Sequence, residues 1–210
     1  MKMTLFERFY ALNIDTSVLG LERCDDNKDW YVPKGARIFA TLSVDGILFC
    51  FIDGFGEMVF ALSPETNDDN VCHPLANNFE DFLGLVLSCK SADPLEQIYW
   101  LDKDRFYHLI NVENEEWHNA EIDTAKEAAL SAIRSELGVK PIDEPYDFVR
   151  SVQAGFDYSR IVYNDEYYET LGLPNPNPDE DHHTDENGNI IYNYEQTAVV
   201  SIIIRDSHEE

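Results

Sequence analysis

Metal-ligating side chains gather in one short segment towards the C-terminal end of the chain. His182 and His183 are adjacent there, and four carboxylates flank them: Asp179, Glu180, Asp181 and Asp185. Imidazole and carboxylate groups bind zinc and similar divalent ions, so one alternative for this protein is a metal-dependent hydrolase. Neighbouring side chains on a flexible acidic loop point in divergent directions, and we therefore favour a solvated loop without a metal.

Two other patterns could carry chemistry, and both have a simpler interpretation. Cys72 and His73 could form a nucleophile and its base, but sequence-adjacent side chains rarely face each other, and Pro74 follows in what we expect to be a loop. Gly54-Phe55-Gly56 is too short for a phosphate-binding loop, so its glycines favour a turn. The chain has no Gly-x-Ser-x-Gly, Walker or His-Glu-x-x-His motif. We predict a protein that is not an enzyme and needs no cofactor.

The charge balance points instead to a partner molecule. The chain has 210 residues, and 41 acidic against 15 basic side chains give a formal net charge of −26. With 44% apolar residues it can still bury a core and fold compactly. Its negative field repels phosphate backbones and anionic bilayers, which argues against nucleic acid and membrane surfaces as partners. It favours a basic protein surface.

Carboxylates select a cationic partner, and tyrosines offer large contact area with few rotatable bonds. Both residue types are frequent between residues 143 and 169. The candidate partner-binding residues are Asp53, Glu57, Asp68, Asp69, Asp165, Glu166 and Tyr167. In the alternative interpretation, the acids only keep the protein in solution and several of the tyrosines belong to the core.

Three features of the sequence favour a cytoplasmic location. The N-terminus reaches the charge pair Glu7-Arg8 before any apolar run of leader length, so we expect no secretory leader. No stretch approaches the ~18 consecutive apolar residues of a transmembrane helix. The four cysteines form neither a Cys-x-x-Cys pair nor a disulfide scaffold, and we expect them to be buried free thiols: Cys24, Cys50, Cys72 and Cys89.

Periodicity and turn residues predict a helix followed by a three-stranded β-meander. Thr4 and Glu7 have capping-box spacing, so a helix should begin at Leu5 and pack on a sheet. Strand-like alternation starts at Ala36, and Asp45-Gly46 suits a tight turn before a return strand over 47–52. That run is apolar on both faces of its pleat, so it should lie centrally, with helices covering it. A turn over 53–56 leads to a third strand, 58–62.

Helices are predicted to follow the meander. Asn78 should cap a helix with its apolar stripe at Phe79, Phe82, Leu83 and Val86. Two short helices, or one broken helix, are expected after Asp93-Pro94. Thr124 and Glu127 have the spacing of a second capping box, and the helix they open should end at Gly138.

The composition changes in the last third of the chain. Residues 136–210 hold 17 acidic and 4 basic side chains. We predict an α+β domain over residues 1–137 and an acidic C-terminal extension over 138–210, either part of the same domain or a small lobe. Ile190–Tyr192 and Ala198–Ile204 predict a terminal β-hairpin. The predicted fold class is thus α+β, an antiparallel β-meander sheet covered by helices, with a C-terminal β extension.

The order of these elements resembles the SUKH superfamily over roughly residues 1–110. The likeness rests on the N-terminal helix, on Trp30 and Gly35, on the strand-turn-strand-turn-strand unit 38–62, and on Phe79-Glu80-Asp81-Phe82-Leu83 opening a helix. SUKH proteins include fungal regulators of cell-wall assembly and bacterial immunity proteins. The resemblance implies an α+β domain whose sheet and loops bind another protein, commonly a polymorphic toxin.

Charge and resemblance together favour a cytoplasmic, non-enzymatic immunity protein that neutralises a basic, nuclease-type toxin. A net charge of −26 would steer the chain to a basic cleft and let it occupy the place of a phosphate backbone. The main alternative is a regulatory or scaffold module with no toxin partner, and the metal-dependent hydrolase comes third.

Overall fold

The computed structural model divides the chain into two compact units, Met1–Leu173 and Pro174–Glu210. It describes residues 3–24, 29–42, 45–65, 70–116, 120–176, 183–184 and 190–191.

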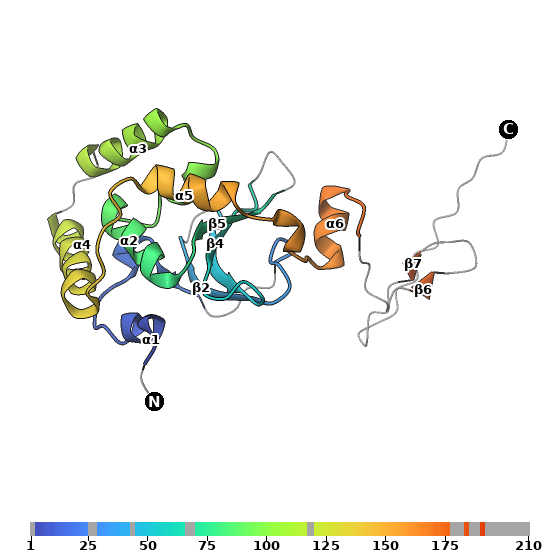
Figure 1. Cartoon of the computed structure of the whole chain (residues 1–210), viewed down its shortest axis with the longest axis horizontal. Helices are drawn as coiled ribbons and strands as arrows, with labels where there is room; N and C mark the ends of the chain where they lie inside the picture. The colour runs from blue at the N-terminus through green and yellow to red at the C-terminus, as the bar shows by residue number, and fades with distance from the viewer. Residues whose placement is uncertain are drawn as a thin grey trace. The chain divides into compact units, whose positions relative to one another are not determined.

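In its described residues, the first unit holds a five-stranded sheet, six α-helices and four short helical turns. Figure 1 shows their arrangement. The strands are β1 (Glu22–Arg23), β2 (Ala36–Thr41), β3 (Leu48–Ile52), β4 (Val59–Leu62) and β5 (Cys72–Ala76). The α-helices are α1 (Leu5–Tyr10), α2 (Phe79–Cys89), α3 (Lys103–Glu116), α4 (Ala120–Ala132), α5 (Pro145–Ala154) and α6 (Asp165–Leu171). The short turns are η1 (Ser17–Leu19), η2 (Glu96–Tyr99), η3 (Ile133–Leu137), which is a π-helical turn, and η4 (Tyr158–Arg160).

The sheet is an antiparallel meander with the strand order β1-β2-β3-β4-β5. β3 lies in the middle and all five of its residues are buried, which confirms the prediction from its doubly apolar pattern. The two predicted turn residues, Asp45 and Gly46, lie between β2 and β3. Asp45 and Gly46 have φ values of 53° and 65°, a region that glycine and aspartate adopt more readily than most residues.

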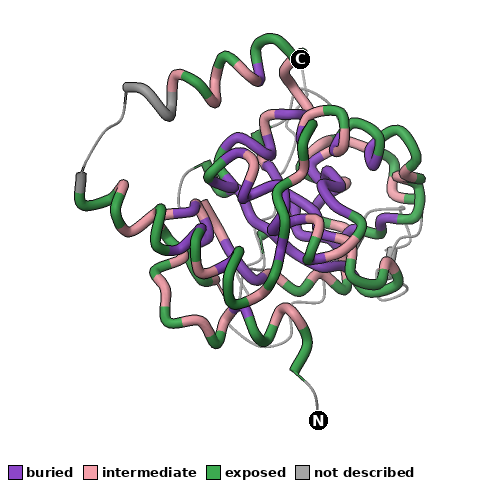
Figure 2. Tube along the Cα trace, turned by 60° about the vertical axis from the view of Figure 1, so that its left-hand side comes forward, coloured by how far each residue is buried: buried purple, intermediate pink, exposed green. Residues whose placement is uncertain are grey.

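Each face of the sheet carries its own apolar cluster. Helices α1 to α5 contribute to the first cluster, and in Figure 1 they lie to the left of and above the strands. On the second face, side chains at 30–32 and at 156–173, including α6, pack on β3 and β4. Buried residues therefore concentrate at the sheet and at the helix sides facing it, while the outer surfaces are exposed (Figure 2). The fold class is α+β, as predicted, with an aromatic segment as well as helices covering the sheet.

The predicted helix boundaries agree with the structure in three places. Thr4 accepts from the backbone N–H of Glu7, and Glu7 accepts from the backbone N–H of Thr4, which completes the capping box of α1. Asn78 caps α2 by accepting from the N–H of Asp81. Gly138 ends the helical run α4–η3 in the left-handed conformation, with φ 76°.

Two local predictions are wrong. Thr124 does not cap a helix, because α4 is already helical from Ala120. The stretch Cys72-His73-Pro74, expected to be a loop, forms β5, the last strand of the sheet. Proline has no N–H to donate to a ladder, so sheets accept it on edge strands and at bulges. β5 is at the edge of the described sheet, and its register with β4 shifts beside Phe60, the partner of Pro74.

The C-terminal part of the chain falls into both units. Residues 138–173 carry α5 and α6 and belong to the first unit with the sheet, so the predicted boundary at 137 lies inside that unit. In the second unit β6 (His183–Thr184) pairs antiparallel with β7 (Ile190–Ile191). Tyr192 and the predicted strand Ala198–Ile204 lie outside the described residues, as do His182 and all four carboxylates named around the two histidines.

Candidate functional site

An open groove lies beside α1 on the first unit. It consists of two adjoining hollows, of about 640 and 510 Å³, that share Phe6, Arg37 and Phe51. We call it the α1 groove. The larger hollow is lined by Thr4, Leu5, Phe6, Arg37, Phe51, Gly56, Glu57, Asn78, Phe79, Glu80 and Asp81. The smaller is lined by Phe6, Glu7, Tyr10, Ala11, Arg23, Arg37, Ile38, Phe39 and Phe51.

The floor of the α1 groove is aromatic. Phe6 is half-buried, and its ring packs edge-to-face on Phe51 and Phe79, with centroids 5.3 and 5.1 Å apart. It packs in the same way on Phe39 and Tyr10, at 5.7 and 4.9 Å. These contacts fix the Phe6 ring from several sides, so the floor is preformed.

The rim of the larger hollow is mainly acidic. Glu57 comes from the turn between β3 and β4, and Glu80 and Asp81 come from the first turn of α2. Glu57 and Glu80 are exposed, and within the described part of the chain neither forms a salt bridge. Asp81 accepts from the Nδ2 of Asn78 at 2.8 Å, and its partial burial raises the pKa of its carboxyl.

Arginine side chains already lie on aromatic rings in this groove. The guanidinium carbon of Arg37 is 5.6 Å from the Phe51 ring centre, and its Nε is 3.5 Å from Oδ1 of Asp53. The guanidinium of Arg23 lies 5.2 Å from the centre of the Tyr10 ring in the smaller hollow. A guanidinium packed on a ring beside a carboxylate is thus an arrangement that the groove accommodates.

The described members of the predicted partner-binding set come from two places, the turn between β3 and β4 and the helix α6. Glu57 lines the α1 groove, and Asp53 sits beside it through Arg37. Asp165 and Glu166 lie in the first turn of α6, whose side chains pack on the second face of the sheet. Asp68 and Asp69 lie outside the described residues.

Tyr167 does not present its ring for a partner. It is only 4% exposed and belongs to the second-face core. Tyr167 therefore fits the alternative interpretation, in which several tyrosines between residues 143 and 169 belong to the core. The spacing of Tyr167 and Leu171, one helical turn apart, is the sequence feature that indicates a buried stripe.

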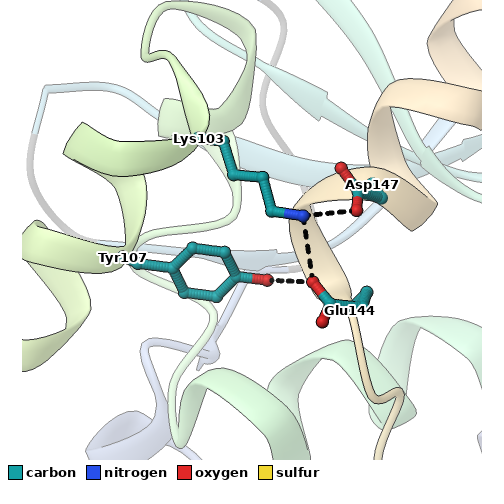
Figure 3. Close-up of polar contacts among 4 residues, drawn as sticks. All are labelled: Lys103, Tyr107, Glu144 and Asp147. Carbon is teal, nitrogen blue, oxygen red and sulfur yellow. Dashed lines mark hydrogen bonds and ion pairs between the residues drawn. The ribbon is translucent and has the colours of Figure 1, made fainter.

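A second polar cluster joins α3 to the start of α5. Nζ of Lys103 lies 2.6 Å from Oδ2 of Asp147 and 3.1 Å from Oε2 of Glu144, and the hydroxyl of Tyr107 donates to the same Glu144 oxygen at 3.2 Å (Figure 3). Hydrogen bonds to Asp147 and Glu144 raise the pKa of Lys103, so its amine stays protonated. A protonated lysine is no nucleophile, and the cluster serves as a tie between two helices.

The pair Cys72-His73 cannot act as nucleophile and base. Successive side chains of a strand point to opposite faces, and β5 places Cys72 in the second-face core while His73 stacks on Tyr99 with centroids 3.7 Å apart. Burial raises the pKa of the Cys72 thiol well above its ordinary value, and the thiol stays protonated. All four cysteines are free; three are buried and Cys24 is half-buried.

The described residues hold no cluster of three or more His, Cys, Asp or Glu side chains that could bind a metal ion. The segment around His182 lies mostly outside them, so the metal interpretation stays a prediction. None of the helices in the described ranges combines the length and apolar character needed to cross a bilayer.

Comparisons of the chain with protein-family models, curated proteins and solved structures gave no match. The resemblance to the SUKH superfamily stays a prediction.

Sequence reasoning missed most of the α1 groove. Its lining residues come from separate elements, and no spacing along the chain relates them. They include Phe6 of α1, Arg37 of β2, Phe51 of β3 and Glu80 of α2. The only available sequence feature was the run Phe79-Glu80-Asp81, which places two carboxylates beside an aromatic residue at a helix start.

Proposed function

We propose that this chain is a cytoplasmic, non-enzymatic binding protein that recognises a basic protein through the α1 groove. The observation that carries the proposal is the groove itself, in which a preformed aromatic floor adjoins two exposed carboxylates, on a chain of net charge −26. Protein-binding surfaces commonly have aromatic residues at their centre and polar or charged residues at their rim.

Electrostatics supports a cationic partner. The larger hollow has three carboxylates on its rim against one guanidinium, that of Arg37, which Asp53 already pairs. The field of the whole chain would add long-range attraction for a basic surface and speed up association. Binding of this kind weakens as salt rises, because ions screen the attraction.

Among basic partners we favour a toxin, which makes the chain an immunity protein. This step rests on the SUKH-like order of elements in residues 1–110. Nuclease-type toxins have basic clefts, and an acidic protein seated there would exclude the phosphate backbone. A regulatory or scaffold module remains the alternative, and it would use the same groove on a non-toxic partner.

Co-expression tests the toxin proposal. The toxin domain of a polymorphic protein encoded beside this chain is expressed in a sensitive host, alone and with the chain. We expect the wild-type chain to restore growth, the variant Glu57→Gln/Glu80→Gln to restore it less, and the matched variant Glu166→Gln/Glu169→Gln to restore it fully. Growth that does not depend on the chain would overturn the toxin proposal.

A further inference from the structure

The larger hollow of the α1 groove has the components of an arginine site but holds no arginine over its Phe6 ring. Arg37, which also lines this hollow, packs on Phe51 instead and pairs with Asp53. The half-buried Phe6 ring, Glu57 and Glu80 all line the larger hollow, and neither carboxylate has a salt bridge among the described residues. The ring and the carboxylates are therefore present, and the guanidinium is the missing part.

We infer that the larger hollow selects an arginine side chain of the partner over a lysine side chain. The inference rests on the proposed function and names the chemistry of the partner at that site. A guanidinium is planar and weakly hydrated, so it can lie on the Phe6 ring while its N–H groups donate to Glu57 or Glu80. An ammonium is a compact and strongly hydrated charge, which gains the ion pair but less from the ring.

The size of the hollow is consistent with this occupant. Its volume of about 640 Å³ lies within the range of roughly 300–1,000 Å³ that ligand sites span. Oδ2 of Asp81, the other carboxylate that lines the hollow, already accepts from Asn78 at 2.8 Å, whereas Glu57 and Glu80 have no salt bridge among the described residues.

Calorimetric titration with two peptides of equal charge tests the inference. Nona-arginine and nona-lysine have the same electrostatic attraction to the chain, so a difference in their affinities reports on the side chains. We expect the wild-type protein to bind nona-arginine about threefold to fivefold more tightly. Phe6→Leu should bring the ratio of the two affinities towards one. Glu57→Gln/Glu80→Gln should weaken the binding of nona-arginine more than the binding of nona-lysine.

The matched control is Glu166→Gln/Glu169→Gln, which removes the same charge from exposed positions on α6. Glu166 lies in the first turn of α6 as Glu80 lies in the first turn of α2, so these two substitutions each remove a carboxylate from a helix start. The control should keep the wild-type ratio. If Phe6→Leu does not fold, the two double variants, which change only exposed side chains, still decide the question.

The outcomes separate the inference from the proposed function. Equal affinity of the wild-type protein for the two peptides, or a preference that survives both groove variants, overturns the inference and leaves binding of basic partners intact. Binding of neither peptide at low salt overturns the proposed function itself.

Discussion

Tyr163 and Tyr167 stack face to face in the second-face core, with ring centroids 3.7 Å apart and planes 8° from parallel. Both rings belong to the apolar cluster that packs the segment 156–173 on the sheet. Burial raises the pKa of Tyr163 far above its ordinary value, so its hydroxyl stays protonated. The most tyrosine-rich part of the first unit, which also carries four carboxylates, is therefore part of its core.

Replacing Tyr167 should cost stability. We expect Tyr167→Ala to lower the free energy of unfolding by about 3 kcal/mol, because a buried aromatic ring is lost and a cavity remains. The exposed neighbour provides the control, and Glu166→Gln should change the same quantity by less than about 0.5 kcal/mol. Denaturant titration measures both. A Tyr167→Ala protein as stable as the wild type would mean that this segment does not pack on the sheet.

Two glycines at helix ends should respond differently to alanine. Gly138 has φ 76°, so Gly138→Ala places a side chain in the left-handed region and should cost about 1 kcal/mol. Gly155 ends α5 at φ −91°, and an added Cβ would meet its nearest atom at 3.7 Å, an ordinary contact. Gly155→Ala should be neutral or slightly stabilising. Thermal unfolding of both variants checks the pair, and equal losses would contradict the assignment of Gly138 as a left-handed cap.

The cap of α2 supports one wall of the α1 groove. Asn78 accepts from the N–H of Asp81 and donates to its carboxylate, each at 2.8 Å. Asn78→Ala should lower the free energy of unfolding by about 1 kcal/mol, since both bonds are lost. Asn77→Ala changes the same residue type one position earlier, and its effect should be within about 0.5 kcal/mol. Equal free energies of unfolding for the two variants would contradict the role of Asn78 as the cap of α2.

Glu96 should give the protein a distinctive pH dependence. Its carboxyl is buried, and burial raises its pKa against the opposing effect of a hydrogen bond from the Trp100 indole at 2.8 Å. The folded state thus holds this proton to higher pH than the unfolded state does. The stability contributed by protonated Glu96 is present below the ordinary pKa of 4.5 and is lost as pH rises through the raised pKa.

The variant Glu96→Gln removes this titration. The free energy of unfolding of the wild type, relative to that of Glu96→Gln, should fall as pH rises from about 4 and level off above the raised pKa. Denaturant titrations at several pH values measure the difference. A difference that grows with pH would show that the carboxylate, not the acid, is the form that the fold prefers.

The parts of the fold that were predicted correctly depend on local patterns. The capping box of Thr4 and Glu7 and the Asp45-Gly46 turn depend on residues within one turn of chain, and both signatures are specific. The doubly apolar run at β3 requires burial on both faces wherever it occurs, so its central place followed from composition alone.

The incorrect predictions concern features that tertiary structure decides. β5 contains Pro74 and a buried histidine, a composition typical of a loop, and its pairing with β4 makes it a strand. Thr124 has the spacing of a cap, but α4 is already helical before it, and a local pattern cannot detect that. The α1 groove joins four elements, so only Glu57 of its rim was among the predicted residues.

The location of the binding site is tested most directly by amide NMR. The isotope-labelled protein is titrated with nona-arginine. We predict that the largest shift changes fall on Phe6, Gly56, Glu57 and the first turn of α2, and that they diminish in Glu57→Gln/Glu80→Gln. Shift changes concentrated on α6, around Glu166 and Glu169, with none in the α1 groove, would contradict the account.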